Sequence, residues 1–222
     1  MGLMATASGG TDFDPMPEGV HIARCYAVID LGTHTNMFGK DQHKTLICWE
    51  VPGERIDVER DGKQVNLPRG MSHRYTLSIH RKAVLRQLLE SWRGKAFTPD
   101  ELEGFDLQNV VGVPCQLQVI HEAGKKDPTK TYANVKGVMP MPKGEDKKPI
   151  PAPPQENPST FFSMADSMEI PATVPDWVQE IIHESNEWKQ YQANTMSPCG
   201  DFPNGMDTDG NLIDESDVLL PF

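Results

Sequence analysis

Basic side chains that could bind phosphate gather in two stretches of the chain. Between Arg69 and Lys95 there are seven Lys and Arg residues but only one acidic residue, Glu90. A second run, over 125–136, holds four lysines against one aspartate. A single nucleic-acid strand is bound by such positive surfaces together with aromatic rings on which its bases stack. We therefore predict that a strand contacts Arg74, His80, Arg81, Lys82, Arg86, Lys125, Lys126, Lys130, Tyr132 and Lys136.

Residues for catalysis or metal binding form no recognisable pattern. The seven histidines are scattered, no serine or cysteine lies in a nucleophile motif, and no glycine-rich phosphate loop is present. The four cysteines, at 25, 48, 115 and 199, lack the spacing of metal ligands. The first three lie in apolar, strand-like segments, so we expect these three to be buried free thiols. We expect no enzymatic activity, no metal and no cofactor.

The net charge of −11 is divided unevenly along the chain. Residues 1–150 contain 20 basic and 19 acidic side chains, a balance of +1, whereas residues 151–222 contain 1 and 13, a balance of −12. This difference predicts a nearly neutral body followed by a strongly acidic tail.

The tail ends in the sequence DESDVLLPF, and large apolar residues are unusual at a disordered end. A terminal carboxylate beside a phenylalanine can be captured in a basic, apolar pocket of another protein. We expect partner proteins to hold this tip through Asp214, Glu215, Asp217, Leu220, Pro221 and Phe222.

The elements expected to carry the basic patches are mainly β-strands. Alternating and β-branched apolar residues predict strands over 19–31, 44–51, 73–80, 114–121 and 131–139. Helical spacing predicts a helix over 81–92, and the Thr98–Glu101 motif predicts a short second helix. Five strands with a helix between the third and the fourth is the element order of the OB-fold, a small five-stranded barrel. The apolar sides of these elements are predicted to place Trp49, Tyr75 and Trp92 in the core.

The composition divides the chain into further parts. Residues 1–16 are expected to form a disordered leader, and residues 17–140 an OB-fold domain that binds single-stranded nucleic acid. Residues 141–175 are rich in proline and predict an extended linker. An amphipathic helix is predicted over 176–191, either docked on the barrel or free to bind a partner, and residues 192–222 are expected to form the disordered acidic tail.

Five stretches of the body, within residues 17–144, are PEGVHIARCYAVIDLGT, HKTLICWEVP, YTLSIHRKAVLRQLLESWRGKAFTPDEL, FDLQNVVGVPCQLQVIHE and YANVKGVMPMPKG. With these stretches the body resembles a phage family of single-stranded DNA-binding proteins with an OB-fold. The resemblance implies that the protein coats single-stranded DNA during phage replication and recombination, with little sequence preference, in the cytoplasm of the bacterial host. No apolar run approaches the roughly 20 residues of a membrane helix, and no secretion signal begins the chain, which agrees with that location.

The tip is similar to the tail of bacterial single-stranded DNA-binding proteins, which ends in aspartates, an aliphatic residue, Pro and Phe. That resemblance implies recruitment of replication, recombination and repair proteins, and weak competition with DNA for the barrel. Ser216, Val218 and Leu219 depart from the pattern and leave the partners undefined. An alternative hypothesis is an interaction module that imitates the host tail tip and binds or inhibits host repair or defence proteins. RNA as the ligand and a homo-oligomeric state also stay open.

Overall fold

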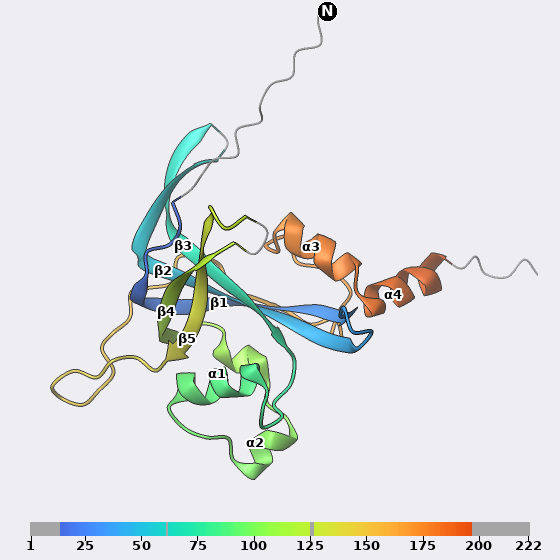
Figure 1. The fold of residues 1–222 in the computed structure, drawn as a ribbon, viewed down its shortest axis with the longest axis horizontal. Helices are drawn as coiled ribbons and strands as arrows, with labels where there is room; N and C mark the ends of the chain where they lie inside the picture. Colours follow the sequence, from blue (N-terminus) through green and yellow to red (C-terminus); the bar gives the residue numbers. More distant parts are fainter. Residues whose placement is uncertain (1–13, 61, 125–126, 197–222) are drawn as a thin grey trace, which may run out of the picture.

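The computed structural model describes residues 14–60, 62–124 and 127–196, and a single curled sheet dominates it. Its edge strands, β3 and β5, approach each other across the open side of this half-barrel (Figure 1). The chain is therefore mainly β, as the sequence predicts. The main sheet has antiparallel neighbours in the order β3-β2-β1-β4-β5, formed by β1 (Gly19–Thr35), β2 (Asp41–Arg60), β3 (Lys63–Thr76), β4 (Pro114–Ala123) and β5 (Thr131–Met139).

The β2–β3 hairpin is longer than the sequence predicts. The strand expected over 44–51 continues through Pro52 to the end of β2, because an irregularity after Val51 takes the proline out of the regular ladder. The strand expected over 73–80 begins ten residues earlier and ends at Thr76. The chain after Thr76 consequently leaves the sheet. His80, predicted at the end of a strand, and Arg81 and Lys82, predicted at the start of a helix, lie instead in the connection between β3 and the helix that follows.

Helices α1 (Val84–Arg93) and α2 (Pro99–Glu103) and the 3₁₀ helix η1 (Leu107–Val110) follow β3 and precede β4. Helix α1 begins three residues later than predicted, after Ala83, and ends at Gly94, whose φ of 66° is the left-handed conformation that favours glycine. The predicted capping box at Thr98 is confirmed at the start of α2. Apolar residues of α1 enter the core on one face of the sheet, which also contains Trp49, Tyr75 and Trp92, as predicted.

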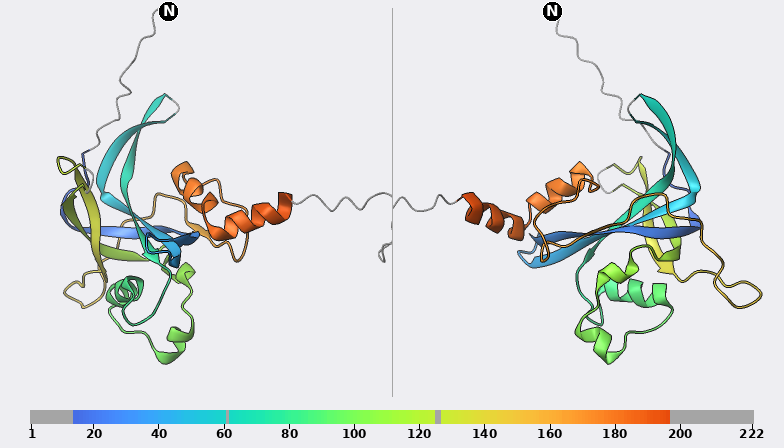
Figure 2. Two further views of the ribbon diagram at one scale, coloured as in Figure 1. Left: turned by 45° about the vertical axis from the view of Figure 1, so that its right-hand side comes forward. Right: turned by 180° about the vertical axis from the view of Figure 1, so that it is seen from behind.

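The opposite face of β1 and β2 is covered by the chain that follows β5. Strand β6 (Thr160–Phe162) pairs in parallel with Ala27–Ile29 of β1, beyond the part of β1 that β4 occupies. Helices α3 (Asp176–His183) and α4 (Asn186–Met196) lie on the same side of the sheet (Figure 2). They complete a second core that contains Ile29, Leu31, Leu46, Phe162, Val178 and Ile182.

Residues 141–175 therefore differ from the extended linker that their proline content predicts. The carboxylate of Glu50 is fully buried and accepts hydrogen bonds from the backbone N–H groups of Glu156 and Asn157, at 2.9 and 2.8 Å. The side-chain amide of Asn157 donates a third bond to the same carboxylate, at 2.7 Å. These bonds attach the proline-rich chain to β2 just before β6, a long-range contact that composition does not reveal.

The amphipathic segment over 176–191 is docked, which was one of the two alternatives left by the sequence. It forms two helices, and its buried side is made by Val178 and Ile182, whereas Trp177 is 46% exposed. The apolar periodicity predicted one helix at this place, where the structure has two, and the second continues to Met196.

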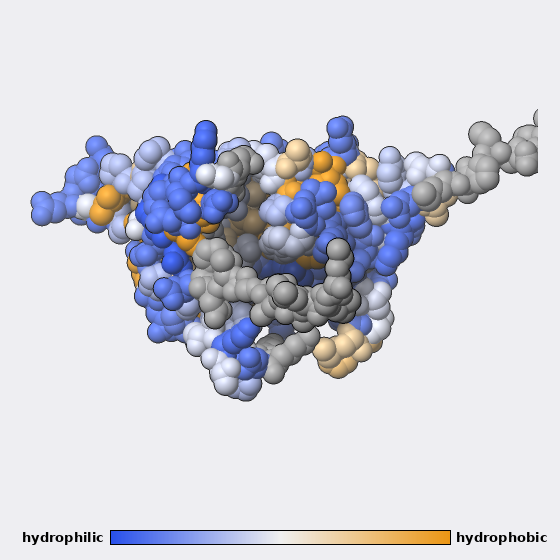
Figure 3. All heavy atoms as spheres, turned by 90° about the horizontal axis from the view of Figure 1, so that it is seen from above, coloured by the Kyte–Doolittle hydropathy of each residue, from blue (hydrophilic) through white to orange (hydrophobic). Residues whose placement is uncertain are grey.

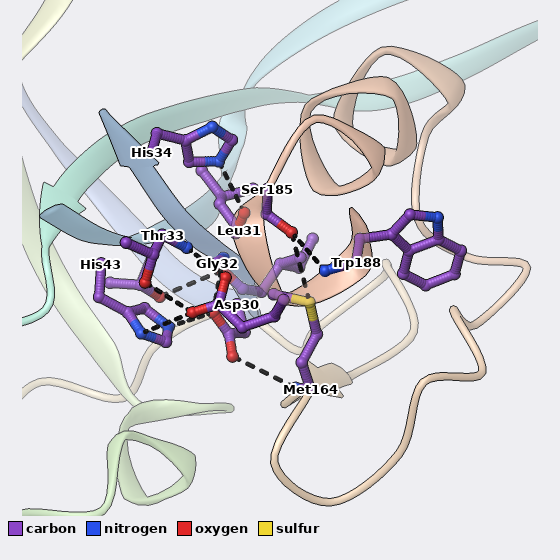
Figure 4. A network of polar contacts seen from close by, with 12 residues as sticks. Asp30, Leu31, Gly32, Thr33, His34, His43, Met164, Ser185 and Trp188 are labelled. Atoms are coloured by element: carbon purple, nitrogen blue, oxygen red, sulfur yellow. Dashed lines mark hydrogen bonds and ion pairs between the residues drawn. The ribbon is translucent and has the colours of Figure 1, made fainter. Parts of the chain in front are cut away.

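Gly32 of β1 lies close against Met164 and Ser185 of the C-terminal chain (Figure 4). Its φ is 75°, and a Cβ added there would lie 2.5 Å from the Cβ of Ser185 and 2.6 Å from the Cε of Met164. Only a glycine fits this site without displacing its neighbours.

Polar contacts on either side of Gly32 strengthen the same junction (Figure 4). Glu187 accepts hydrogen bonds from the backbone N–H and the hydroxyl of Thr33, at 2.7 and 2.6 Å. Asp30 pairs with the Nε2 of His43 at 2.6 Å and accepts from the backbone N–H of Met164 at 3.2 Å. The C-terminal helices are thus held by an apolar core and by a charged network.

The predicted free thiols are confirmed for Cys25, Cys48 and Cys115, which are all buried. Burial raises the pKa of Cys48 to about 12 and raises the pKa values of Cys25 and Cys115 well above the ordinary thiol value. These thiols are consequently protonated and unreactive at neutral pH. Cys199 lies outside the described residues.

Candidate nucleic-acid interface

A first hollow, of about 560 Å³, lies where β3 ends and the chain turns toward α1. Among the residues that the structure describes, its lining includes the cationic side chains of Lys44, Arg74 and Lys82, the imidazole of His80, and no carboxylate. Lys44 reaches this place because β2 pairs it with Thr76, whose hydroxyl accepts a hydrogen bond from Lys44 Nζ at 2.8 Å. Three cations without an acidic neighbour in the lining make this hollow suitable for phosphate.

Arg74 also contacts the C-terminal helices. It is exposed on β3, and its guanidinium carbon lies 5.8 Å from the centre of the Trp177 ring of α3, within the range of a cation–π contact. Docking of α3 thus limits the directions in which Arg74 can point. The face that carries α3 and the end of the β2–β3 hairpin is mostly hydrophilic (Figure 3).

A second hollow, of about 760 Å³, lies over β4, β5 and the loop between them. Tyr132 and Lys136 of β5 line it and are exposed, and Asn134 lies between them on the strand. The Tyr132 ring is held close to the loop, since a Cβ added to Gly124 would lie 2.8 Å from Tyr132 Cε2. Tyr132 is 52% exposed, so a face of its ring is accessible to a stacking ligand.

His73 and Val84 line both hollows and so join them into one surface. The His73 ring lies against Tyr75, with ring centroids 4.6 Å apart. Burial lowers the pKa of His73 below its ordinary value, so its ring is uncharged at pH 7. Val84 is 66% exposed at the start of α1. The boundary between the hollows is therefore largely apolar and uncharged.

The structure brings to these hollows five of the ten residues that were predicted to contact a single-stranded nucleic acid. Arg74, His80 and Lys82 line the first, and Tyr132 and Lys136 line the second. The exposed residues Arg81 and Lys130 line neither hollow.

Arg86 has a different environment. Its Nε donates to Glu90 at 2.9 Å in a partly buried ion pair along α1, so its charge is already balanced. Lys125 and Lys126, and all six residues of the predicted partner-binding tip, lie outside the described residues.

Sequence reasoning missed Lys44, His73 and Val84 as members of this surface. Lys44 stands outside both basic runs, and only its pairing with Thr76 places it beside Lys82. His73 lies within the first basic run, so its position gave a signal that could have been used. Val84 lies within the stretch predicted to be a helix, and as the first residue of α1 it is left exposed.

Within the described residues, no group of three or more potential ligands is placed to hold a metal ion. None of the helices in this part of the chain is long and apolar enough to cross a membrane. No family model, no curated protein and no solved structure matches the chain.

Proposed function

We propose that the protein binds single-stranded DNA through the surface formed by the two hollows. The observation that carries this proposal is their adjacency: three cations line one hollow, an exposed tyrosine lines the other, and His73 and Val84 join them. Phosphates need the first kind of surface and bases need the second. Single-stranded DNA that crosses the boundary between the hollows can place its phosphates on the cations and a base on the tyrosine.

The half-barrel is proposed to be an OB-fold. Its five antiparallel strands in the order β3-β2-β1-β4-β5, with α1 between β3 and β4, support this assignment. In OB-folds the middle strands and the loop between the last two strands take part in binding. The surface proposed here uses the end of β3 and the β4–β5 hairpin, which agrees with that arrangement.

The wider role proposed from the resemblance is that of a phage protein that coats single strands during replication and recombination in a bacterial host. The acidic tip over 214–222 is proposed to recruit replication and recombination proteins and to compete weakly with DNA. Deletion of 214–222 should tighten strand binding at low salt and abolish partner binding. Weaker strand binding by the truncated protein would disprove the competition.

The central test is a titration of fluorescently labelled oligo-dT at about 50 mM and about 200 mM salt. Binding is expected, with an affinity that falls steeply as salt rises. Charge reversal of Lys44 and Lys82 together should lower the affinity and flatten the salt dependence by about two charges. The matched control is double reversal of Lys148 and Lys189, which are exposed outside both hollows and change the net charge equally.

If oligo-dT does not bind, the proposed function is wrong, and the interaction-module hypothesis becomes the better one. If the control variant weakens binding as much as the Lys44–Lys82 variant, basic residues anywhere on the surface contribute equally, and the hollows are not the binding site.

A further inference from the structure

The two hollows differ in the chemistry that they offer to a ligand. The first is cationic, whereas the described lining of the second contains the carboxylates of Glu122 and Asp127 together with Lys136. Cations attract phosphate, and the described lining of the first hollow has three of them and no carboxylate, so the sugar–phosphate chain of bound DNA is favoured there. The second hollow is left for the bases.

Among the described residues of the second hollow, side-chain oxygens offer several hydrogen-bond acceptors. The side-chain amide of Asn134 donates to Glu122 Oε2 at 2.9 Å, which leaves the amide oxygen and Glu122 Oε1 for a ligand. Asp127 Oδ1 accepts from the backbone N–H of Thr129 at 3.1 Å and from its hydroxyl, which leaves the second carboxylate oxygen of Asp127. A ligand that enters this hollow is best held by its own N–H donors.

The stacking surface lies directly beside these acceptors. Glu122 and Tyr132 are cross-strand partners in the β4–β5 ladder, so their Cβ atoms are neighbours on one face of the sheet. A base stacked on the exposed face of Tyr132 has its edge within reach of the Glu122 carboxylate. The apolar side chain of Ile120, which precedes Glu122 on the same face of β4, also lines the hollow.

We propose that the second hollow is a base pocket that favours bases with an exocyclic amino group, cytosine above all, over thymine. This inference rests on the proposed strand binding and adds a base preference to it. Cytosine presents its N4 amino group as a donor, whereas thymine presents the O4 acceptor at the same position. Carboxylate acceptors pair with the first and repel the second.

The test compares oligo-dC with oligo-dT of equal length at neutral pH and constant salt. The wild-type protein should bind oligo-dC about tenfold more tightly, the difference expected for one good base-edge contact. Glu122→Gln replaces one acceptor by an amide that can donate to thymine O4, so the two affinities should come within about twofold of each other. Glu103→Gln is the matched control, because Glu103 is exposed on α2 outside both hollows, and it should keep the preference.

Tyr132→Ala provides a second, independent variant, and it should weaken both oligonucleotides by about tenfold through loss of the stacking face. Thermal melts of all variants verify that they fold, which is expected because both Glu122 and Tyr132 are exposed. Equal affinity of the wild type for the two oligonucleotides would overturn the inference while leaving strand binding intact. An unchanged preference in the Glu122→Gln variant would overturn it as well. Failure of both oligonucleotides to bind would instead remove the proposed function itself.

Discussion

Replacement of Gly32 by alanine should loosen the C-terminal helices from the sheet. The added Cβ would lie 2.5 Å from Ser185 Cβ, 2.6 Å from Met164 Cε and 2.8 Å from Glu187 Oε2. These three residues belong to the chain that covers the outer face of β1, so the clash can be relieved by moving that chain away.

The structure offers a matched control that separates two costs of this substitution. Gly39, in the β1–β2 turn, has nearly the same φ, 70° against 75°, but has no atom within 4 Å of an added Cβ. Gly39→Ala should therefore cost only the left-handed backbone penalty, about 1–2 kcal/mol. Gly32→Ala adds an overpacking cost of about 1–3 kcal/mol, for a total of about 2–5 kcal/mol.

Urea unfolding followed by circular dichroism measures both losses, and hydrogen exchange locates them. In the Gly32→Ala protein, amides of β6, α3 and α4 should exchange faster than in the wild type, while those of α1 and β5 keep their protection. The Gly39→Ala protein should leave exchange in β6, α3 and α4 unchanged. Equal losses of stability in the two variants, with unchanged exchange over 160–196, would refute the close contact at Gly32.

Three further predictions concern charged groups. The hydrogen bond to Asp30 raises the pKa of His43 above 6.5. This pair therefore stabilises the fold most at lower pH, and less as the pH rises through the raised pKa. The free energy of unfolding of the His43→Gln protein should depend less on pH between about pH 6 and 8 than that of the wild type. Glu50→Ala should lower the free energy of unfolding by about 2–4 kcal/mol, because three N–H donors lose their buried acceptor, and an unchanged urea midpoint would contradict that role. Arg86→Gln should leave the salt dependence of oligo-dT binding unchanged, since Arg86 is paired with Glu90. Lys82→Gln should lower the slope of that dependence by about one charge. A slope lowered as much by Arg86→Gln as by Lys82→Gln would place Arg86 in the interface.

Much of the sheet could be predicted because its signals are local. Strand β5 has the bounds that its apolar pattern predicts, and β4 extends only two residues farther. The capping box at Thr98 was readable from four consecutive residues. The core positions of Trp49, Tyr75 and Trp92 followed from the same alternation of apolar and polar residues.

Predictions failed where a contact between distant residues outweighed the local signal. Proline-rich sequence favours extended chain, yet Glu50 binds the backbone at 156–157 and β6 adds to a part of β1 that β4 leaves free. Both faces of β1 are apolar, and this demands a second layer, but nothing in the sequence says which segment supplies it.

The candidate interface, too, could be predicted from the sequence only in part. The basic run around Arg74 and Lys82 and the exposed Tyr132 were identifiable by residue type and spacing. The sequence by itself thus determined a mainly β chain, a nearly neutral body with two basic stretches, and an acidic tail. Only the tertiary structure decided which basic residues share a surface, because strand register places Lys44 beside Thr76 and the curl of the sheet brings His73 of β3 within reach of β5. Residue type limits what a side chain can bind, but its neighbours depend on pairings between strands far apart in the chain.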